Sequence, residues 1–178
     1  MILLGIGSNL DSKFGNRFSN IRKTIDLLNK EKVNVIKISS FYETPSYPDN
    51  SLPKFINVIV KVKFSGDPVS LLKKIFKIEK EMGRVRKSIN EPRTCDIDII
   101  DFNGQILENG AVKLPHPKLH ERNFVLYPLF EICPDWIHPL NNKKIDILIK
   151  KLTLEMTNQI TRMKESDILY KWSITTNL

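Results

Sequence analysis

The sequence predicts an α+β sandwich built on a mostly antiparallel sheet. Segments with strand and helix patterns alternate loosely along the 178 residues, and hairpin-type turns join them instead of the long crossovers that parallel strands require. A chain of this length with 41% hydrophobic residues can bury a core without a metal or a disulfide framework. Its two cysteines, Cys95 and Cys133, therefore favour a reducing compartment, and we expect a cytoplasmic protein.

The first elements follow from local patterns. Continuous apolar residues 2–6 predict a buried strand that ends in the polar loop Gly7-Ser8-Asn9. Residues 17–30 carry apolar side chains at helical spacing, and Asn16 is the expected N-cap. Residues 33–40 predict a second strand.

The middle of the chain continues this alternation after a loop. The Pro-, Ser- and Asn-rich segment 41–51 predicts a loop of a length that is often functional. Residues 55–64 alternate in hydrophobicity and predict a strand. Asp67-Pro68 begins a helix that Gly83 ends, and residues 95–102 predict the next strand.

The last third predicts two further helices. The first begins near Glu121, and Pro128 should kink or end it. The second is amphipathic and covers residues 144–154. We expect a single domain over residues 1–156 and a weakly patterned tail of unknown role over 157–178.

The net charge of +8 has two different sources. Lysines are dispersed along the chain, as on a solvated surface, and this favours neither a nucleic acid nor a membrane as partner. Four of the arginines, in contrast, fall between residues 84 and 122: Arg84, Arg86, Arg93 and Arg122. Because a guanidinium matches phosphate oxygens in pairs, this grouping indicates a phosphate-binding site.

Two carboxylates stand inside the arginine-rich stretch, in Pro92-Arg93-Thr94-Cys95-Asp96-Ile97-Asp98. On a strand, Asp96 and Asp98 project from the same face with Cα atoms roughly 6.6 Å apart. Such a pair can share two Mg²⁺ ions about 3.5–4 Å apart, and oxygen ligands suit this cation. The segment therefore predicts a magnesium site next to the phosphate site.

No glycine-rich nucleotide loop accompanies these groups. Gly5-Ile6-Gly7 lacks the third glycine of the dinucleotide fingerprint, and GxxxxGK[ST] is absent from the sequence. Phosphate chemistry must therefore depend on side chains and metal. His116 and Arg122 add a second pair suited to phosphate, and Glu79 could hold an arginine or a ribose hydroxyl.

Two rings and an amide complete the candidate site. Phe55 and Asn57 share one face of a predicted strand, and Phe124 follows Arg122 closely. A planar heterocycle could stack between the rings while the amide pairs with its edge. Two core phenylalanines and a turn asparagine remain the alternative interpretation.

Over residues 2–155 the chain resembles the 6-hydroxymethyl-7,8-dihydropterin pyrophosphokinase family of folate synthesis. The resemblance rests on these blocks, in family order: Gly7-Ser8-Asn9-Leu10, Ser40-Phe41-Tyr42-Glu43-Thr44-Pro45, Phe55-Ile56-Asn57, Gly83-Arg84-Val85-Arg86, Pro92-Arg93-Thr94-Cys95-Asp96-Ile97-Asp98-Ile99, Leu114-Pro115-His116-Pro117 and Arg122-Asn123-Phe124. It implies a three-layer α-β-α sandwich with a ferredoxin-like sheet. It also implies transfer of pyrophosphate from MgATP to the pterin hydroxymethyl group, with release of AMP.

The resemblance further implies a role for each candidate residue. Two Mg²⁺ ions would bind Asp96 and Asp98, and the catalytic groups would be Arg84, Arg93 and Asp98. ATP would contact Glu79, Arg84, Arg86, Arg93, His116 and Arg122. The pterin would lie against Thr44, Pro45, Phe55, Asn57 and Phe124. Only these small molecules are expected as partners of a monomer.

Two other functions compete with this interpretation. A basic RNA- or DNA-binding domain would need surface aromatics between its cations, and the sequence offers no such pattern. A nucleotidyltransferase could use the two aspartates with Gly7-Ser8 as a phosphate loop. That hypothesis gives no reason for Phe55, Asn57 and Phe124.

Overall fold

The computed structural model describes residues 1–84, 91–108 and 110–164 of the chain. Its strands are β1 (Ile2–Ser8), β2 (Asn34–Ile38), β3 (Tyr42–Thr44), β4 (Phe55–Lys63), β5 (Asp96–Phe102) and β6 (Thr161–Arg162). Its α-helices are α1 (Arg17–Lys30), α2 (Pro68–Glu81), α3 (Asn123–Ile132), α4 (Ile145–Ile149) and α5 (Leu154–Asn158), and a short 3₁₀ helix covers Leu119–Glu121. In these described ranges no helix has the length and apolar character needed to cross a membrane.

All strand pairs of the six-stranded sheet are antiparallel, as the sequence predicts. The order is β5-β1-β4-β3-β6, and β2 pairs with the other half of the β4 edge that β3 uses. Strand β1 therefore lies in the centre between β4 and β5. Strand β1 therefore separates β4, which carries Phe55 and Asn57, from β5, which carries Asp96 and Asp98.

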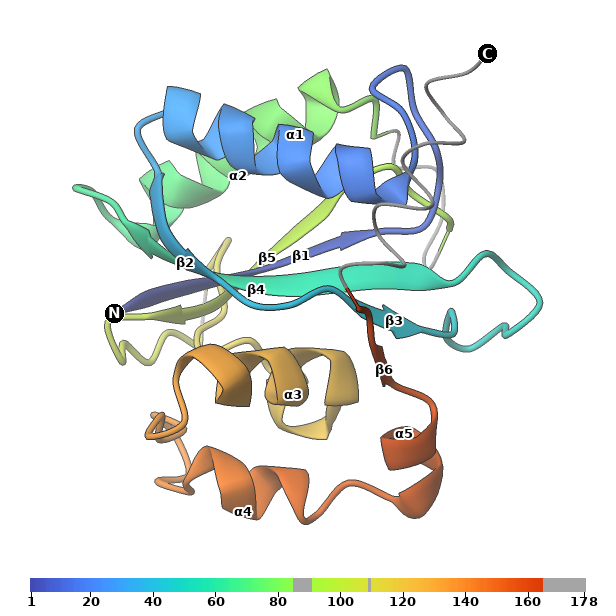
Figure 1. Cartoon of the computed structure of the whole chain (residues 1–178). Helices are drawn as coiled ribbons and strands as arrows, with labels where there is room; N and C mark the ends of the chain where they lie inside the picture. The colour runs from blue at the N-terminus through green and yellow to red at the C-terminus, as the bar shows by residue number, and fades with distance from the viewer. Residues whose placement is uncertain (85–90, 109, 165–178) are drawn as a thin grey trace.

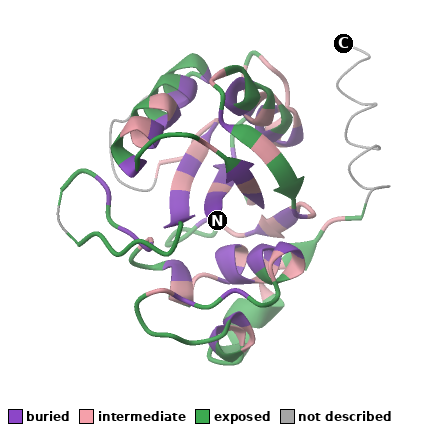
Figure 2. Ribbon diagram, turned by 90° about the vertical axis from the view of Figure 1, so that its left-hand side faces the viewer, coloured by how far each residue is buried: buried purple, intermediate pink, exposed green. Residues whose placement is uncertain are grey.

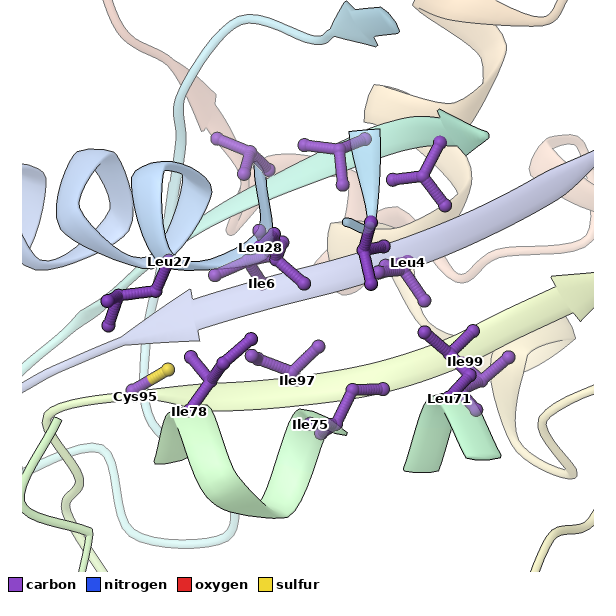
Figure 3. Packing of buried hydrophobic residues seen from close by; sticks show 14 of the residues in the cluster. Leu4, Ile6, Leu27, Leu28, Leu71, Ile75, Ile78, Cys95, Ile97 and Ile99 are labelled. Carbon is purple, nitrogen blue, oxygen red and sulfur yellow. The ribbon is translucent and has the colours of Figure 1, made fainter. Parts of the chain in front are cut away.

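Helices cover both faces of the sheet. Figure 1 shows α1 and α2 on one side and α3, α4 and α5 on the other. Figure 3 shows the larger core, in which leucine and isoleucine side chains of α1 and α2 pack on β1 and β5. The second cluster packs Leu3, Ile59 and Ile100 of the sheet against α3 and α4. Buried residues accordingly follow each other along the central strands in Figure 2, because both of their faces are covered.

The caps of the two long helices are confirmed. The Asn16 side chain accepts hydrogen bonds from the backbone N–H groups of Phe18 and Ser19, and α1 begins at the next residue. Asp67 caps α2 in the same way, with Pro68 at the first helical position. Gly83, with a φ of +84°, ends α2 in the left-handed conformation that glycine adopts most readily.

The structure differs from four expectations about element boundaries. Strand β1 continues through Gly7 and Ser8, because both are paired with β4. The predicted loop 41–51 contains β3, whose backbone pairs with β4. Pro128 does not end helix α3, which continues to Ile132, since residues on both sides of the proline pack in the second core cluster. The single helix predicted over 144–154 is wrong in its extent: α4 ends at Ile149, and α5 begins only at Leu154.

Candidate functional site

Strand β5 places Asp96 and Asp98 on one face of the sheet, as predicted. Their cross-strand neighbours on β1 are Gly7 and Gly5, respectively. The intervening Ile97 belongs to the core cluster on the opposite face, and so does Cys95 just before the strand. The two carboxylates keep 26% and 38% of their side-chain surface exposed. A ligand can therefore approach both of them.

The C-terminus of α2 brings Arg84 to Asp96. The Arg84 backbone N–H donates to the carbonyl of Glu79, and that of Gly83 donates to Lys80, which together form a Schellman motif. The Arg84 guanidinium then lies 2.5 Å from Asp96 Oδ1 and also contacts Glu79 Oε1. Burial lowers the pKa of Arg84, but the charges of Asp96 and Glu79 outweigh this, so its pKa is raised overall. Arg84 therefore stays positively charged beside Asp96.

Glu79 has a second partner at the open edge of the sheet. Its side chain is buried and accepts a hydrogen bond of 3.0 Å from the backbone N–H of Ile97 on β5. Since β5 is an edge strand in the described sheet, this bond satisfies one of its outward-facing donors. Glu79 therefore fixes Arg84 and the start of β5 with the same carboxylate.

Arg93 reaches the other oxygen of Asp96 from the loop before β5. Its Nη1 lies 3.0 Å from Asp96 Oδ2, and its Nε donates to the carbonyl of Glu91. The guanidinium carbon lies 5.8 Å from the centre of the Phe55 ring. Arg93 thus contacts a predicted metal ligand and a predicted pterin residue at once.

Asp98 faces the Arg122 guanidinium and the His116 imidazole, which both come from the segment before α3. Arg122 Nη1 lies 3.5 Å from Asp98 Oδ2, and His116 Nε2 lies 3.9 Å from the same oxygen. Burial, and then the neighbouring charge of Asp96, raise the pKa of Asp98 to about 6. Burial, and then the charge of Arg122, lower the pKa of His116 to about 4. His116 is therefore neutral at pH 7, and its Nδ1 accepts from the backbone N–H of Lys118.

The predicted pterin residues lie beside this cluster on β3, β4 and α3. Asn57, also opposite Gly7, donates a hydrogen bond of 3.0 Å to Thr44 Oγ1, and Thr44 pairs with Phe55 in the sheet. The two phenylalanines are each covered by a guanidinium: Arg93 over Phe55, and Arg122 over Phe124 at 5.4 Å. Pro45 follows Thr44 and is half-buried.

One predicted site residue and one alternative need separate mention. Arg86 lies outside the described residues. Ser8 is buried within β1 and its hydroxyl donates to the carbonyl of Leu10, so Gly7-Ser8 is a strand segment and not the phosphate loop of the nucleotidyltransferase hypothesis. That hypothesis therefore loses its phosphate contact.

The donor set at Asp96 and Asp98 fits Mg²⁺. Both are hard oxygen donors on one face, and they are partly exposed. In the described ranges, no group of three or more His, Cys, Asp or Glu side chains converges as a metal site. Mg²⁺ commonly binds through one or two carboxylates and completes its shell with water and substrate phosphates, so two carboxylates suffice.

The sequence analysis missed one residue of the site, Asn9. Its side chain is buried and bonds both the Arg93 loop and the segment that joins β3 to β4. Its place in the block Gly7-Ser8-Asn9-Leu10 was the available signal, but a single asparagine after a strand is also typical of a turn.

Comparisons with known proteins identify the family of the chain. Residues 3–134 match the model of the family described as 7,8-dihydro-6-hydroxymethylpterin-pyrophosphokinase (HPPK). The chain is 40% identical over 144 residues to the 2-amino-4-hydroxy-6-hydroxymethyldihydropteridine pyrophosphokinase of Aquifex aeolicus, covering 81% of this chain and 87% of that protein. It is also 40% identical over 131 residues to the enzyme of the same name from Bacillus subtilis, covering 73% and 76% of the two chains.

Larger proteins contain a similar part. The chain is 33% identical over 150 residues to the folic acid synthesis protein fol1 of Schizosaccharomyces pombe, but these cover 84% of this chain and only 20% of that protein. Among solved structures, the Plasmodium falciparum HPPK-DHPS A437G protein with pteroate has a TM-score of 0.67 at 17% identity, covering 90% of this chain and 46% of that chain. This last likeness concerns the fold alone.

Proposed function

The chain belongs to the 7,8-dihydro-6-hydroxymethylpterin-pyrophosphokinase family, and from this premise we propose how its own side chains divide the work of the reaction. The enzyme transfers pyrophosphate from ATP to 6-hydroxymethyl-7,8-dihydropterin in folate synthesis. The observation that supports our assignment is the cluster in which Asp96 and Asp98 face Arg84, Arg93 and Arg122.

The arginine side of this cluster is our proposed triphosphate site. A triphosphate carries about four negative charges, which calls for several cations around it. Arg84, Arg93 and Arg122 approach from three different segments, and each is held by a carboxylate. Neutral His116 adds an imidazole nitrogen, and we retain Glu79 and Arg86 as nucleotide contacts.

Asp96 and Asp98 are our proposed ligands of two Mg²⁺ ions. Bound there, the ions would neutralise phosphate charge and orient the phosphates. The partial exposure of both carboxylates and their position between the arginines support this assignment.

The surface formed by Thr44, Pro45, Phe55, Asn57 and Phe124 is our proposed pterin site. The Asn57 amide oxygen and its hydrogen-bonded neighbour Thr44 can pair with the edge of a flat heterocycle. The phenylalanine rings offer faces for stacking. Because Arg93 and Arg122 contact both these rings and the carboxylates, the hydroxymethyl group would lie next to the phosphates.

The chemical step then needs little covalent work from the protein. The pterin hydroxyl oxygen bonds to the β-phosphorus, the bond from that phosphorus to the α,β-bridging oxygen breaks, and AMP leaves with the electron pair. Arg84 and Arg93 hold the phosphates, and Asp98 is our candidate acceptor of the hydroxyl proton. Positioning and charge stabilisation account for catalysis of this kind.

The test is product analysis with matched variants. Protein, ATP, Mg²⁺ and 6-hydroxymethyl-7,8-dihydropterin should yield AMP and the pterin diphosphate by mass spectrometry, and Asp96→Ala should abolish turnover. Asp101→Asn is the control, since Asp101 lies on the same strand but bonds Trp136 and Gly104. Turnover at the wild-type rate in Asp96→Ala would refute the metal assignment while leaving the family assignment intact.

We further propose the layer arrangement, the domain bounds, the location and the oligomeric state that the sequence analysis expects. Helices on both sheet faces support a three-layer, ferredoxin-like arrangement. We keep residues 1–156 as one catalytic domain, although β6 of the following segment pairs with β3. Free cysteines support a cytoplasmic location. We also propose that the protein is a monomer and that its partners are the two substrates, with neither nucleic acid nor membrane among them.

A further inference from the structure

Asn9 lies at the junction of three segments that are distant in sequence. Its residue is 2% exposed. Its Oδ1 accepts a hydrogen bond of 2.6 Å from the backbone N–H of Arg93. Its Nδ2 donates to Ser46 Oγ at 3.2 Å and to the Pro53 carbonyl at 3.1 Å. Both amide donors and one acceptor position are thus used inside the protein.

The backbone of Asn9 and Leu10 binds the carbonyl group of Arg93. The N–H groups of Asn9 and Leu10 both donate to the carbonyl oxygen of Arg93, at 3.0 and 3.2 Å. Arg93 therefore has its N–H and its carbonyl fixed by the same short loop. Its guanidinium, which contacts Asp96 and Phe55, extends from a backbone that Asn9 locates.

The Nδ2 bonds locate the proposed pterin surface. Ser46 lies two residues after Thr44, and Pro53 lies two residues before Phe55. The Ser46 hydroxyl also donates to the Pro53 carbonyl at 2.6 Å, so the two ends of the connection between β3 and β4 meet at the Asn9 amide. We therefore expect a change at this amide to displace both Thr44 and Phe55.

We propose that Asn9 is a positioning residue that sets the phosphate-binding Arg93 and the pterin surface at Thr44 and Phe55 in one fixed relation. The inference rests on the proposed assignment of those residues. The side-chain chemistry explains the choice of amide, because Asn offers an acceptor and two donors on one small planar group. Aspartate would keep the acceptor for Arg93 but turn an oxygen toward the Pro53 carbonyl.

Asn20 provides a matched control. It is also buried, its Nδ2 donates to Ser8 Oγ and to the Leu10 carbonyl, and its Oδ1 accepts from Ser12. These partners lie at the last residue of β1 and in the loop between β1 and α1. Asn20→Asp thus also removes two amide N–H donors from a buried side chain, but this side chain has no hydrogen bond to Arg93, Ser46 or Pro53 among those given above.

The experiment compares steady-state kinetics and melting temperature for Asn9→Asp and Asn20→Asp. We expect both variants to have a lower melting temperature, and only Asn9→Asp to raise the KM for the pterin, by about tenfold for the loss of the two buried hydrogen bonds to Ser46 and Pro53. The KM for ATP should change less, because the bond to Arg93 survives. Asn9→Ala, which removes both sets of bonds, should raise both KM values.

Several outcomes decide the proposal. Pterin KM within about twofold of wild type in Asn9→Asp, or the same increase in Asn20→Asp, would overturn it. If Asn9→Asp does not fold, Ser46→Ala serves instead and should raise only the pterin KM; an unchanged value there overturns the proposal equally. Loss of activity in Asp96→Ala combined with normal kinetics at Asn9 would reject this inference alone, whereas full activity in Asp96→Ala would reject the proposed site.

Discussion

The guanidinium of Arg84 lies 2.5 Å from the carboxylate of Asp96, which joins the C-terminus of α2 to the first residue of β5. The same guanidinium contacts buried Glu79 on the last turns of α2. The end of α2 positions the Arg84 guanidinium, which is therefore held between the carboxylates of Glu79 and Asp96. This contact organises the part of the site that we assign to phosphate.

Replacing Glu79 by Gln should weaken this arrangement. The amide keeps an acceptor for the Ile97 N–H but removes the charge opposite Arg84. Breaking a buried pair by changing one partner typically costs about 3–5 kcal/mol, so we expect a lower free energy of unfolding and an ATP KM raised about tenfold or more. Urea unfolding and steady-state kinetics measure the two effects. Glu81→Gln, exposed on the same helix, is the control and should change neither.

Asp98 should titrate near pH 6 in metal-free protein. Burial and the charge of Asp96 raise the pKa of Asp98, so the carboxyl is protonated below that pH and ionised above it. Because a proton and Mg²⁺ compete for the same carboxylate, saturating Mg²⁺ should lower this pKa, and Mg²⁺ affinity should weaken as the pH falls below 6. Carboxyl ¹³C NMR with and without Mg²⁺ tests this. Asp98→Asn should lack the transition; its persistence would assign the titration to another group.

Gly7→Ala should affect pterin binding more than folding. A Cβ at residue 7 would lie 3.2 Å from Asn57 Oδ1, so Asn57 would have to shift slightly, and 3.5 Å from a carbon of the Phe55 ring, which is an ordinary contact. We expect the pterin KM to rise several-fold while the ATP KM stays nearly constant. Gly5→Ala is the comparison, since its Cβ would contact Ile100 and Ile59 instead. Equal kinetic effects in both variants would contradict the prediction.

Glu131 should stabilise the joint between α3, β3 and β6. Its carboxylate accepts hydrogen bonds from the Ser40 N–H and hydroxyl, from the Tyr42 hydroxyl and from Arg162. Glu131→Gln turns an NH₂ group toward some of these donors and should lower the free energy of unfolding by about 1–3 kcal/mol. Denaturant unfolding measures this. The exposed variant Glu155→Gln should stay within about 0.5 kcal/mol of wild type, and a similar value for Glu131→Gln would be a failure of the prediction.

Cys95 should be inert in the folded protein. It packs in the core beside Thr24, and burial raises the pKa of its thiol to about 12. Since the thiolate is the reactive form, a thiol reagent at pH 8 should modify half-buried Cys133 first and Cys95 only after unfolding. Mass spectrometry of the labelled peptides identifies each site. Rapid labelling of Cys95 in native protein would show that its surroundings open readily.

Local chemistry determined much of this protein from the sequence by itself. Asn16 and Asp67 fix the starts of α1 and α2, and Gly83 fixes the end of α2, because caps act on backbone groups a few residues away. The alternation around Asp96 and Asp98 likewise places both carboxylates on one face, since side chains on a strand alternate. These features need no knowledge of distant residues.

Tertiary structure alone decided the relations between segments. Strands β3 and β6 exist because their backbone finds partners in distant strands, and α3 continues past Pro128 because its apolar side chains are buried against the sheet. Asn9 is a turn residue by its sequence, yet it bonds Arg93, Ser46 and Pro53 once the three loops meet. Such hydrogen bonds depend on the packing of the whole sheet, and no local propensity encodes them.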